Sequence, residues 1–94
     1  MIVTDVYTAT QKNGAKYLHP INGIDRARGL CAKITSATWA VITGTSINID
    51  SQSFDNSSTE AMLDAVSVGE TVIQIIIIWS TGEESVIDYT ITVI

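Results

Sequence analysis

The chain has 94 residues, of which 46% are hydrophobic, and its formal net charge at pH 7 is −5. This length holds one domain, the apolar content is too high for a disordered chain, and the acidic balance would repel the phosphates of a nucleic acid. The longest apolar run, residues 72–79, is much shorter than the roughly 20 residues of a membrane-spanning helix, so we expect no membrane segment.

The pattern of residues 1–33 predicts a first strand over residues 2–8, followed by a basic arm or loop. The short motifs after this strand are typical of turns and loops. All five basic residues lie between positions 12 and 33, so residues 1–33 carry a net +3, while residues 34–94 have eight acidic residues and no basic one. This polarity favours docking of the basic segment on an acidic surface of its own chain or of a neighbour; a solvated basic loop explains it equally well.

Three strands are expected in the middle of the chain, at residues 34–42, 46–50 and 59–66. Gly44 ends the first of them, and a polar turn at residues 55–58 precedes the third. The third strand contains good helix formers, but its short length and the Gly-Glu turn after it favour a strand. Trp39 lies in the middle of an apolar strand face, which predicts a place in the core.

The last two strands, residues 71–79 and 85–93, form a predicted hairpin around a glycine-containing loop. The final strand is apolar on one face and polar on the other, which is the half-buried pattern. Its partner is apolar on both faces: Ile73, Ile75 and Ile77 point to the core, and Ile76 and Ile78 point away from it. Burying an isoleucine is worth about 1.5–3 kcal/mol, so we expect Ile76 and Ile78 to be covered.

Two alternatives for burying Ile76 and Ile78 are the N-terminal arm of the same chain and another subunit. The arm is preferred, because it supplies the apolar residues Ile21, Ile24 and Leu30. Trp79 ends its strand beside a polar turn, and either caps the core or serves as an exposed anchor. The predicted interface residues are Arg26, Arg28, Lys33, Ile76, Ile78 and Trp79, with Thr90 and Thr92 as the neighbours of the apolar group.

No pattern in the sequence indicates an enzyme. The single histidine, His19, and the single cysteine, Cys31, lie in the loop-like region without a catalytic signature, and Cys31 is more typical of a small buried residue. The oxygen-rich stretch 50–56 lacks the spacing of a calcium-binding loop, and no glycine-rich phosphate-binding motif occurs. We therefore expect no catalytic residue, no metal site and no cofactor.

Four stretches within residues 34–94 resemble the phage fiber-tail adaptor proteins: ITSATWAV, SINID, AMLDAVSVGET and WSTGEESVIDYTITV. The pattern is also similar to bacterial Ig-like group 2 modules, which share an S-A-x-W strand and a V-x-x-G-x-T turn. The resemblance implies an all-β, Ig-like sandwich of about seven strands with an extended N-terminal arm or loop. Residues 34–94 would form the sandwich core of this single domain, and residues 1–33 its first strand and arm.

The resemblance also implies a structural protein of a bacteriophage virion that links fiber or tail parts by docking. Such a protein is made in the host cytoplasm and assembled in repeated copies with other virion proteins. The lack of a signal-peptide pattern and of an intrachain disulfide agrees with this expectation. The alternatives are a capsid decoration or cement protein, and an Ig-like adhesin or carbohydrate-binding module that would use Tyr7, Tyr17 and Trp79.

Overall fold

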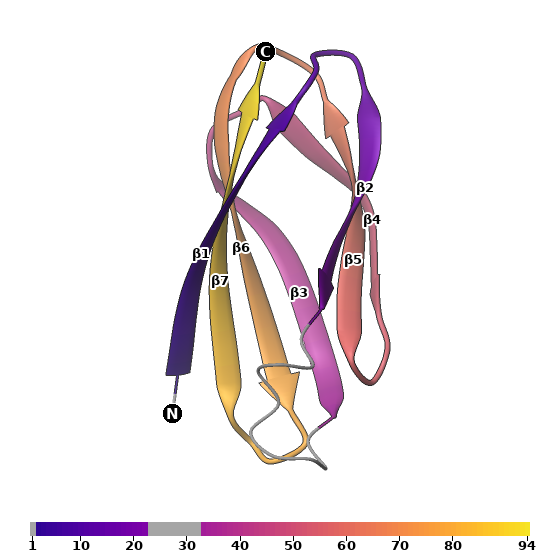
Figure 1. Ribbon diagram of the computed structural model, residues 1–94, viewed down its shortest axis with the longest axis vertical. Coiled ribbons are helices and arrows are strands. Elements are labelled where there is room, and N and C mark those ends of the chain that lie inside the picture. The colour runs from indigo at the N-terminus through magenta and orange to yellow at the C-terminus, as the bar shows by residue number, and fades with distance from the viewer. Residues whose placement is uncertain (1, 23–32) are drawn as a thin grey trace.

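The computed structural model describes residues 2–22 and 33–94, which form seven strands in two sheets (Figure 1). The strands are β1 (Ile2–Gln11), β2 (Lys16–Asn22), β3 (Ile34–Thr43), β4 (Ile47–Phe54), β5 (Ser58–Ala65), β6 (Gly69–Trp79) and β7 (Glu84–Val93). The predicted all-β sandwich of about seven strands is confirmed. Within the described ranges, no helix is long and apolar enough to cross a membrane.

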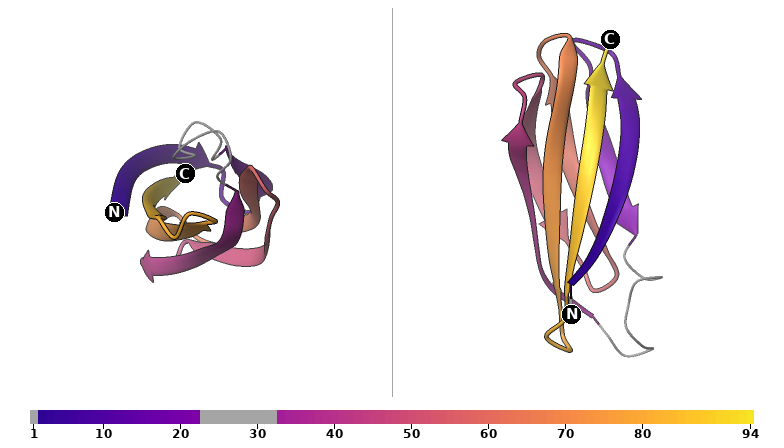
Figure 2. Two further views of the ribbon diagram at one scale, coloured as in Figure 1. Left: turned by 90° about the horizontal axis from the view of Figure 1, so that it is seen from below. Right: turned by 90° about the vertical axis from the view of Figure 1, so that its left-hand side faces the viewer.

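One sheet has four strands in the order β1-β7-β6-β3, and the other has three in the order β2-β5-β4. Neighbouring strands are antiparallel, except that β1 runs parallel to β7. Figure 2 shows the two sheets enclosing the core, with β1 curving along the edge of the four-stranded sheet. The third, sixth and seventh strands share one sheet and the second, fourth and fifth share the other, which is the order of an Ig-like sandwich.

The core lies between the sheets and is built mainly from branched side chains, which suit a pleated surface. Ile73, Ile75 and Ile77 are 0% exposed, as the sequence predicts. Trp39 on β3 is also buried, and its indole Nε1 donates to Thr59 Oγ1 on β5 at 2.9 Å. The one polar atom of this large side chain is therefore paired across the sandwich.

Residues 16–22 form the strand β2, so the expectation of an arm or loop is wrong for this segment. β2 pairs antiparallel along β5 and lies at the edge of its sheet. Pro20 is compatible with that position, because an edge strand can spare one backbone N–H. The predicted interface residues Arg26 and Arg28 lie outside the described residues.

Two predicted turns have clear local causes. Gly44 has a φ of 90°, and a Cβ atom there would collide with the backbone carbonyl oxygen of Glu70, so only glycine fits. In the β4–β5 turn, Asp55 Oδ1 accepts hydrogen bonds from the backbone N–H groups of Ser57 at 2.9 Å and Ser58 at 2.8 Å. These backbone bonds stabilise the carboxylate and lower the pKa of Asp55.

Candidate interaction surface

The outward-facing side chains of β1, β7, β6 and β3 form the candidate interaction surface, called here the outer sheet face. Figure 2, right, shows the backbone of this sheet from its outer side. Its centre lies on β6, where Ile76 and Ile78 alternate with core residues and are half-buried. In register, Ile76 lies between Thr38 of β3 and Val86 of β7. An apolar side chain on β7 therefore widens the apolar area around the predicted pair.

The predicted neighbours of this pair are wrong. Thr90 lies opposite Val72, and Thr92 lies opposite Glu70, because the short hairpin loop sets a register that brings Val86 and Glu84 beside the isoleucines. Pairing in a hairpin is fixed by the turn, and an offset along the strand changes every contact.

Two further valines lie on the outer sheet face. Val72 is half-buried, and Val6 on β1 is 69% exposed. Ile21, expected to help to cover this face, is instead 6% exposed and lies in the core, because alternate residues of β2 point inward. The outer sheet face thus keeps apolar area that the described part of the chain does not bury.

A carboxylate lies beside these apolar side chains. Asp88 on β7 stands between Val6 of β1 and Gln74 of β6. Its Oδ1 atom is buried and has no hydrogen-bond partner within the described residues. Leaving a buried polar atom unpaired costs about 1–3 kcal/mol, and more for a charged group.

The charged side chains on the described outer sheet face are all acidic. Glu70 and Glu84 lie near its two ends, and Asp88 lies at its centre. A surface that is apolar and carries only carboxylates selects partners with apolar and basic groups, because like charges brought together across an interface are costly.

Trp79 belongs to the core, so its proposed role as an exposed anchor is wrong. It is 1% exposed, and its indole Nε1 donates to the buried Ser85 Oγ at 2.8 Å. Trp79 follows Ile77 by two positions, and side chains two apart on a strand point to the same face. The alternative, that Trp79 caps the core, is the correct one.

Lys33 lies at the end of the sandwich where β6 ends. Its backbone N–H donates to Ser80 Oγ at 3.0 Å, and the Ser80 N–H donates to the Lys33 carbonyl at 2.7 Å. The side chain of Lys33 is exposed. The structure therefore brings Lys33 and Ile78 to the same end of the molecule.

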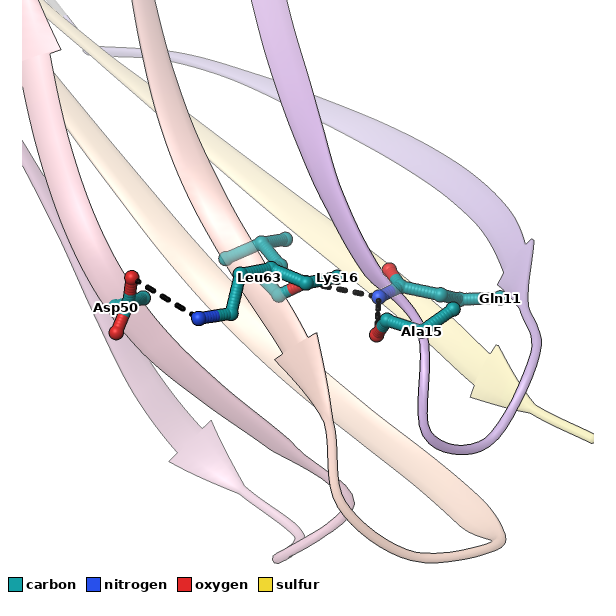
Figure 3. A network of polar contacts seen from close by, with 5 residues as sticks. All are labelled: Gln11, Ala15, Lys16, Asp50 and Leu63. Carbon is teal, nitrogen blue, oxygen red and sulfur yellow. Dashed lines mark hydrogen bonds and ion pairs between the residues drawn. The ribbon is translucent and has the colours of Figure 1, made fainter.

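The core contains a buried polar network that no local sequence pattern predicts. His19 Nδ1 lies 2.7 Å from the Tyr89 hydroxyl, and His19 Nε2 lies 2.8 Å from Gln11 Oε1. Gln11 Nε2 donates to the carbonyls of Ala15 at 3.0 Å and Leu63 at 2.8 Å (Figure 3). Because both amide hydrogens of Gln11 are used, its Oε1 accepts from His19 Nε2, and Nδ1 accepts from Tyr89.

This network connects the two sheets. Gln11 and Tyr89 come from the four-stranded sheet, whereas His19 comes from β2 in the three-stranded sheet. Burial lowers the pKa of His19 and raises the pKa of Tyr89, so both neutral forms are favoured. Both ring nitrogens of His19 are engaged, which leaves neither for a substrate. Cys31, weighed as its catalytic partner, lies outside the described residues.

A shallow hollow of about 240 Å³ lies beside the β4–β5 turn. Its lining residues are Ser53, Phe54, Asp55, Ser58 and Glu60. The Asp55 carboxylate in this hollow is already engaged by the turn backbone. In residues 2–22 and 33–94, no group of three or more His, Cys, Asp or Glu side chains is placed to hold a metal ion.

The exposed aromatic side chains lie far apart, on the two opposite edge strands of the three-stranded sheet. Tyr17 on β2 is 47% exposed, and Phe54 on β4 is 46% exposed. They lie opposite Leu63 and Thr59 of β5, four positions or about 13 Å apart along the strand. Trp79 is buried, so the aromatic row expected of a carbohydrate-binding module is not formed by the described residues.

The fold and the outer sheet face together define an Ig-like β-sandwich module. No family model matches the chain, and no curated protein sequence matches it significantly. Among solved structures, it is similar to a 2,6-sialyltransferase of Vibrionaceae Photobacterium sp. JT-ISH-224 in a ternary complex with CMP and lactose, with a TM-score of 0.63 and 13% sequence identity. The match covers 99% of this chain but 18% of the enzyme chain. At this identity the likeness shows the fold alone.

Proposed function

We propose that the chain is a structural protein of a bacteriophage virion, and that it links fiber or tail parts by docking through the outer sheet face. The observation that carries the proposal is the partly exposed apolar area of Ile76, Ile78 and Val86 on the outer sheet face. Burying this area against another protein would remove apolar surface from water.

The resemblance to fiber-tail adaptors supports the tail position in this proposal. Its stretches fall on β3, β4, β5 and the β6–β7 hairpin, which are the strands that frame the sandwich. A fold alone does not define a function, so the docking surface supports the mechanism and the resemblance supports the setting. A capsid decoration protein would use the same kind of surface at a different place on the particle.

Antibody labelling of purified particles tests the position. In electron micrographs of the phage that encodes the protein, we expect the label at the tail end. Uniform labelling of the capsid would identify a decoration protein instead. Absence of the protein from the particles, checked by mass spectrometry, would contradict both assignments.

A pair of variants tests the docking mechanism in the same particles. Ile76→Thr combined with Ile78→Thr should leave a folded protein that is missing from assembled tails. Val68→Thr is the matched control, because Val68 is 68% exposed on the β5–β6 turn and lies outside the outer sheet face. Incorporation of both variants at the wild-type level would show that this face is not the docking surface.

A further inference from the structure

We propose that β2 is an acid-sensitive strand: protonation of His19 releases β2 from its place along β5, while the sheet formed by β1, β7, β6 and β3 stays folded. This switch belongs to the fold itself and does not depend on the docking partner. It follows from the few buried side chains that hold β2, from the hydrogen bonds of the His19 ring, and from the charges on the strands around that ring.

Few side chains hold β2 in the sandwich. β2 is an edge strand that pairs with β5 alone among the described strands. Of residues 16–21, only His19 and Ile21 are buried, whereas Tyr17 is 47% exposed and Leu18 is 50% exposed. Edge segments with few buried contacts are the ones that open locally, at a lower free energy than unfolding of the whole domain. His19 is therefore one of two buried contacts on which the position of β2 depends.

The start of β2 is held independently of the histidine ring. The Gly14 N–H donates to the Ala65 carbonyl at 2.9 Å, and the Ala65 N–H donates to the Ala15 carbonyl at 2.9 Å. Both are backbone bonds between the β1–β2 turn and the end of β5. The release of β2 therefore begins after residue 15 and leaves the turn and β1 in place.

The hydrogen bonds of His19 favour a neutral ring. Its Nε2 donates to Gln11 Oε1 and its Nδ1 accepts from the Tyr89 hydroxyl, as the amide hydrogens of Gln11 require. A proton on Nδ1 would reverse the bond to Tyr89, so that the ring donates to the hydroxyl oxygen. The hydrogen of Tyr89 would then need a new acceptor, and within the described residues the hydroxyl has no second partner.

No described carboxylate is placed to neutralise a charged His19. On β5 and β7, acidic residues alternate with buried ones and so lie on the outside of the sandwich; those nearest in sequence to the residues around His19 are Glu60, Asp64 and Asp88. Asp5 on β1 lies six positions from Gln11, which is about 20 Å along the strand. The titratable groups that share the inner side with His19 are Tyr7, Tyr17 and Tyr89.

A proton on the buried ring would therefore be a charge without a counter-ion, which is costly. Burial accordingly lowers the pKa of His19. Once β2 is released, the ring reaches water and takes up a proton at its ordinary pKa of 6.5. The equilibrium constant for release should rise by up to about tenfold for each pH unit below 6.5, and level off below the pKa of the closed form.

Release would uncover the inner side chains of β5, among them Ala61 and Leu63, which are now 1% and 0% exposed. It would also leave the backbone groups of β5 that pair with β2 without partners. Such an unpaired strand edge is a template for pairing with another strand. Acid would thus convert a closed sandwich into one with an open edge on β5.

Hydrogen exchange followed by NMR between about pH 7.5 and 5 tests the release. His19 is the single histidine of the chain, and side-chain carboxyl groups ordinarily titrate near pH 4, so this range isolates it. After correction for the intrinsic exchange rate, amides in the β2–β5 pairing should lose about tenfold in protection per pH unit below 6.5. They should be less protected than the amides of β6 and β7 at every pH, and insensitive to low urea, because local opening exposes little surface. Equal protection of β2 and β6 throughout would overturn the proposal, since β2 would then open only with the whole domain.

Two variants separate His19 from the rest of the strand. His19→Gln keeps a donor and an acceptor but does not titrate, so the protection of β2 should no longer depend on pH in this range. Lys16→Gln is the matched control, because Lys16 is an exposed charged residue of the same strand, and it should retain the wild-type slope. The same slope in His19→Gln as in the wild type would overturn the role of His19.

A measurement on the wild type keeps the test valid if His19→Gln does not fold. Nitrogen-15 NMR of the imidazole ring follows the protonation of His19 directly. We expect protonation to proceed in step with the loss of protection along β2. A ring that becomes protonated while β2 stays fully protected would overturn the proposal.

Discussion

His19 Nδ1 and the Tyr89 hydroxyl lie 2.7 Å apart and connect the two sheets through the core. The bond spans 70 positions in sequence, from β2 to β7. The ring planes are nearly perpendicular, with centroids 5.5 Å apart, so the two side chains also pack edge to face. A sandwich without an intersheet disulfide among its described residues thus has a polar connection between its layers.

Removal of the Tyr89 hydroxyl should destabilise the fold. In Tyr89→Phe the ring still fills its place, but His19 Nδ1 loses the hydroxyl that donates to it and stays buried. We expect the free energy of unfolding to fall by about 1–3 kcal/mol, the usual cost of an unpaired buried acceptor. Urea unfolding followed by tryptophan fluorescence measures this change. The double variant with His19→Phe should cost less than the sum of the two single changes, and strict additivity would show that the bond contributes nothing.

Stability should decrease below neutral pH because of His19. Burial lowers the pKa of His19 from 6.5, so the unfolded chain takes up a proton at pH values where the folded chain does not. The contribution is complete above pH 6.5 and is lost as the pH falls through the folded pKa, with a slope of at most about 1.4 kcal/mol per pH unit. Urea titrations over this range measure it. A His19→Gln variant should lack the slope, and parallel curves for the two proteins would reject the assignment.

The alternation of side chains predicted most of the core, because it depends on local geometry alone. A period of two placed Ile73, Ile75 and Ile77 correctly, and the same period places Trp79 with them. The nearby polar turn suggested an exposed tryptophan, but a turn at the end of a strand does not change the direction of its side chains. For Trp79, strand position was the better guide.

The features that the sequence did not predict depend on long-range pairing. The motifs around Pro20 are typical of a loop, and the edge position that makes proline acceptable in β2 is set by pairing with β5. Asp88 belongs to the polar face predicted for the final strand, but the burial of its Oδ1 atom depends on neighbours from β1 and β6. The His19 network combines residues from both sheets, and no local pattern encodes it.

Two adjacent isoleucines on β6 should respond differently to the same substitution. Ile77 is 0% exposed in the core, whereas Ile76 is half-buried on the outer sheet face. Ile77→Ala should lower the free energy of unfolding by about 2–5 kcal/mol through lost burial and a cavity. Ile76→Ala should cost clearly less, because part of its area is already in water. Chemical denaturation of both variants makes the comparison, and equal losses would show that Ile76 is buried in the monomer.

A matched pair of glycines separates backbone strain from steric collision. Gly14 and Gly44 have φ values of 84° and 90°, so alanine is strained at both, by about 1–3 kcal/mol. A Cβ at Gly14 would have no atom within 4 Å, whereas at Gly44 it would collide with the Glu70 carbonyl oxygen and approach Thr71 Oγ1 to 2.8 Å. Gly44→Ala should therefore lower the thermal midpoint considerably more than Gly14→Ala. Equal shifts, measured by calorimetry on both variants, would show that the β3–β4 turn moves to accommodate the methyl group and that Gly44 is required only for its φ.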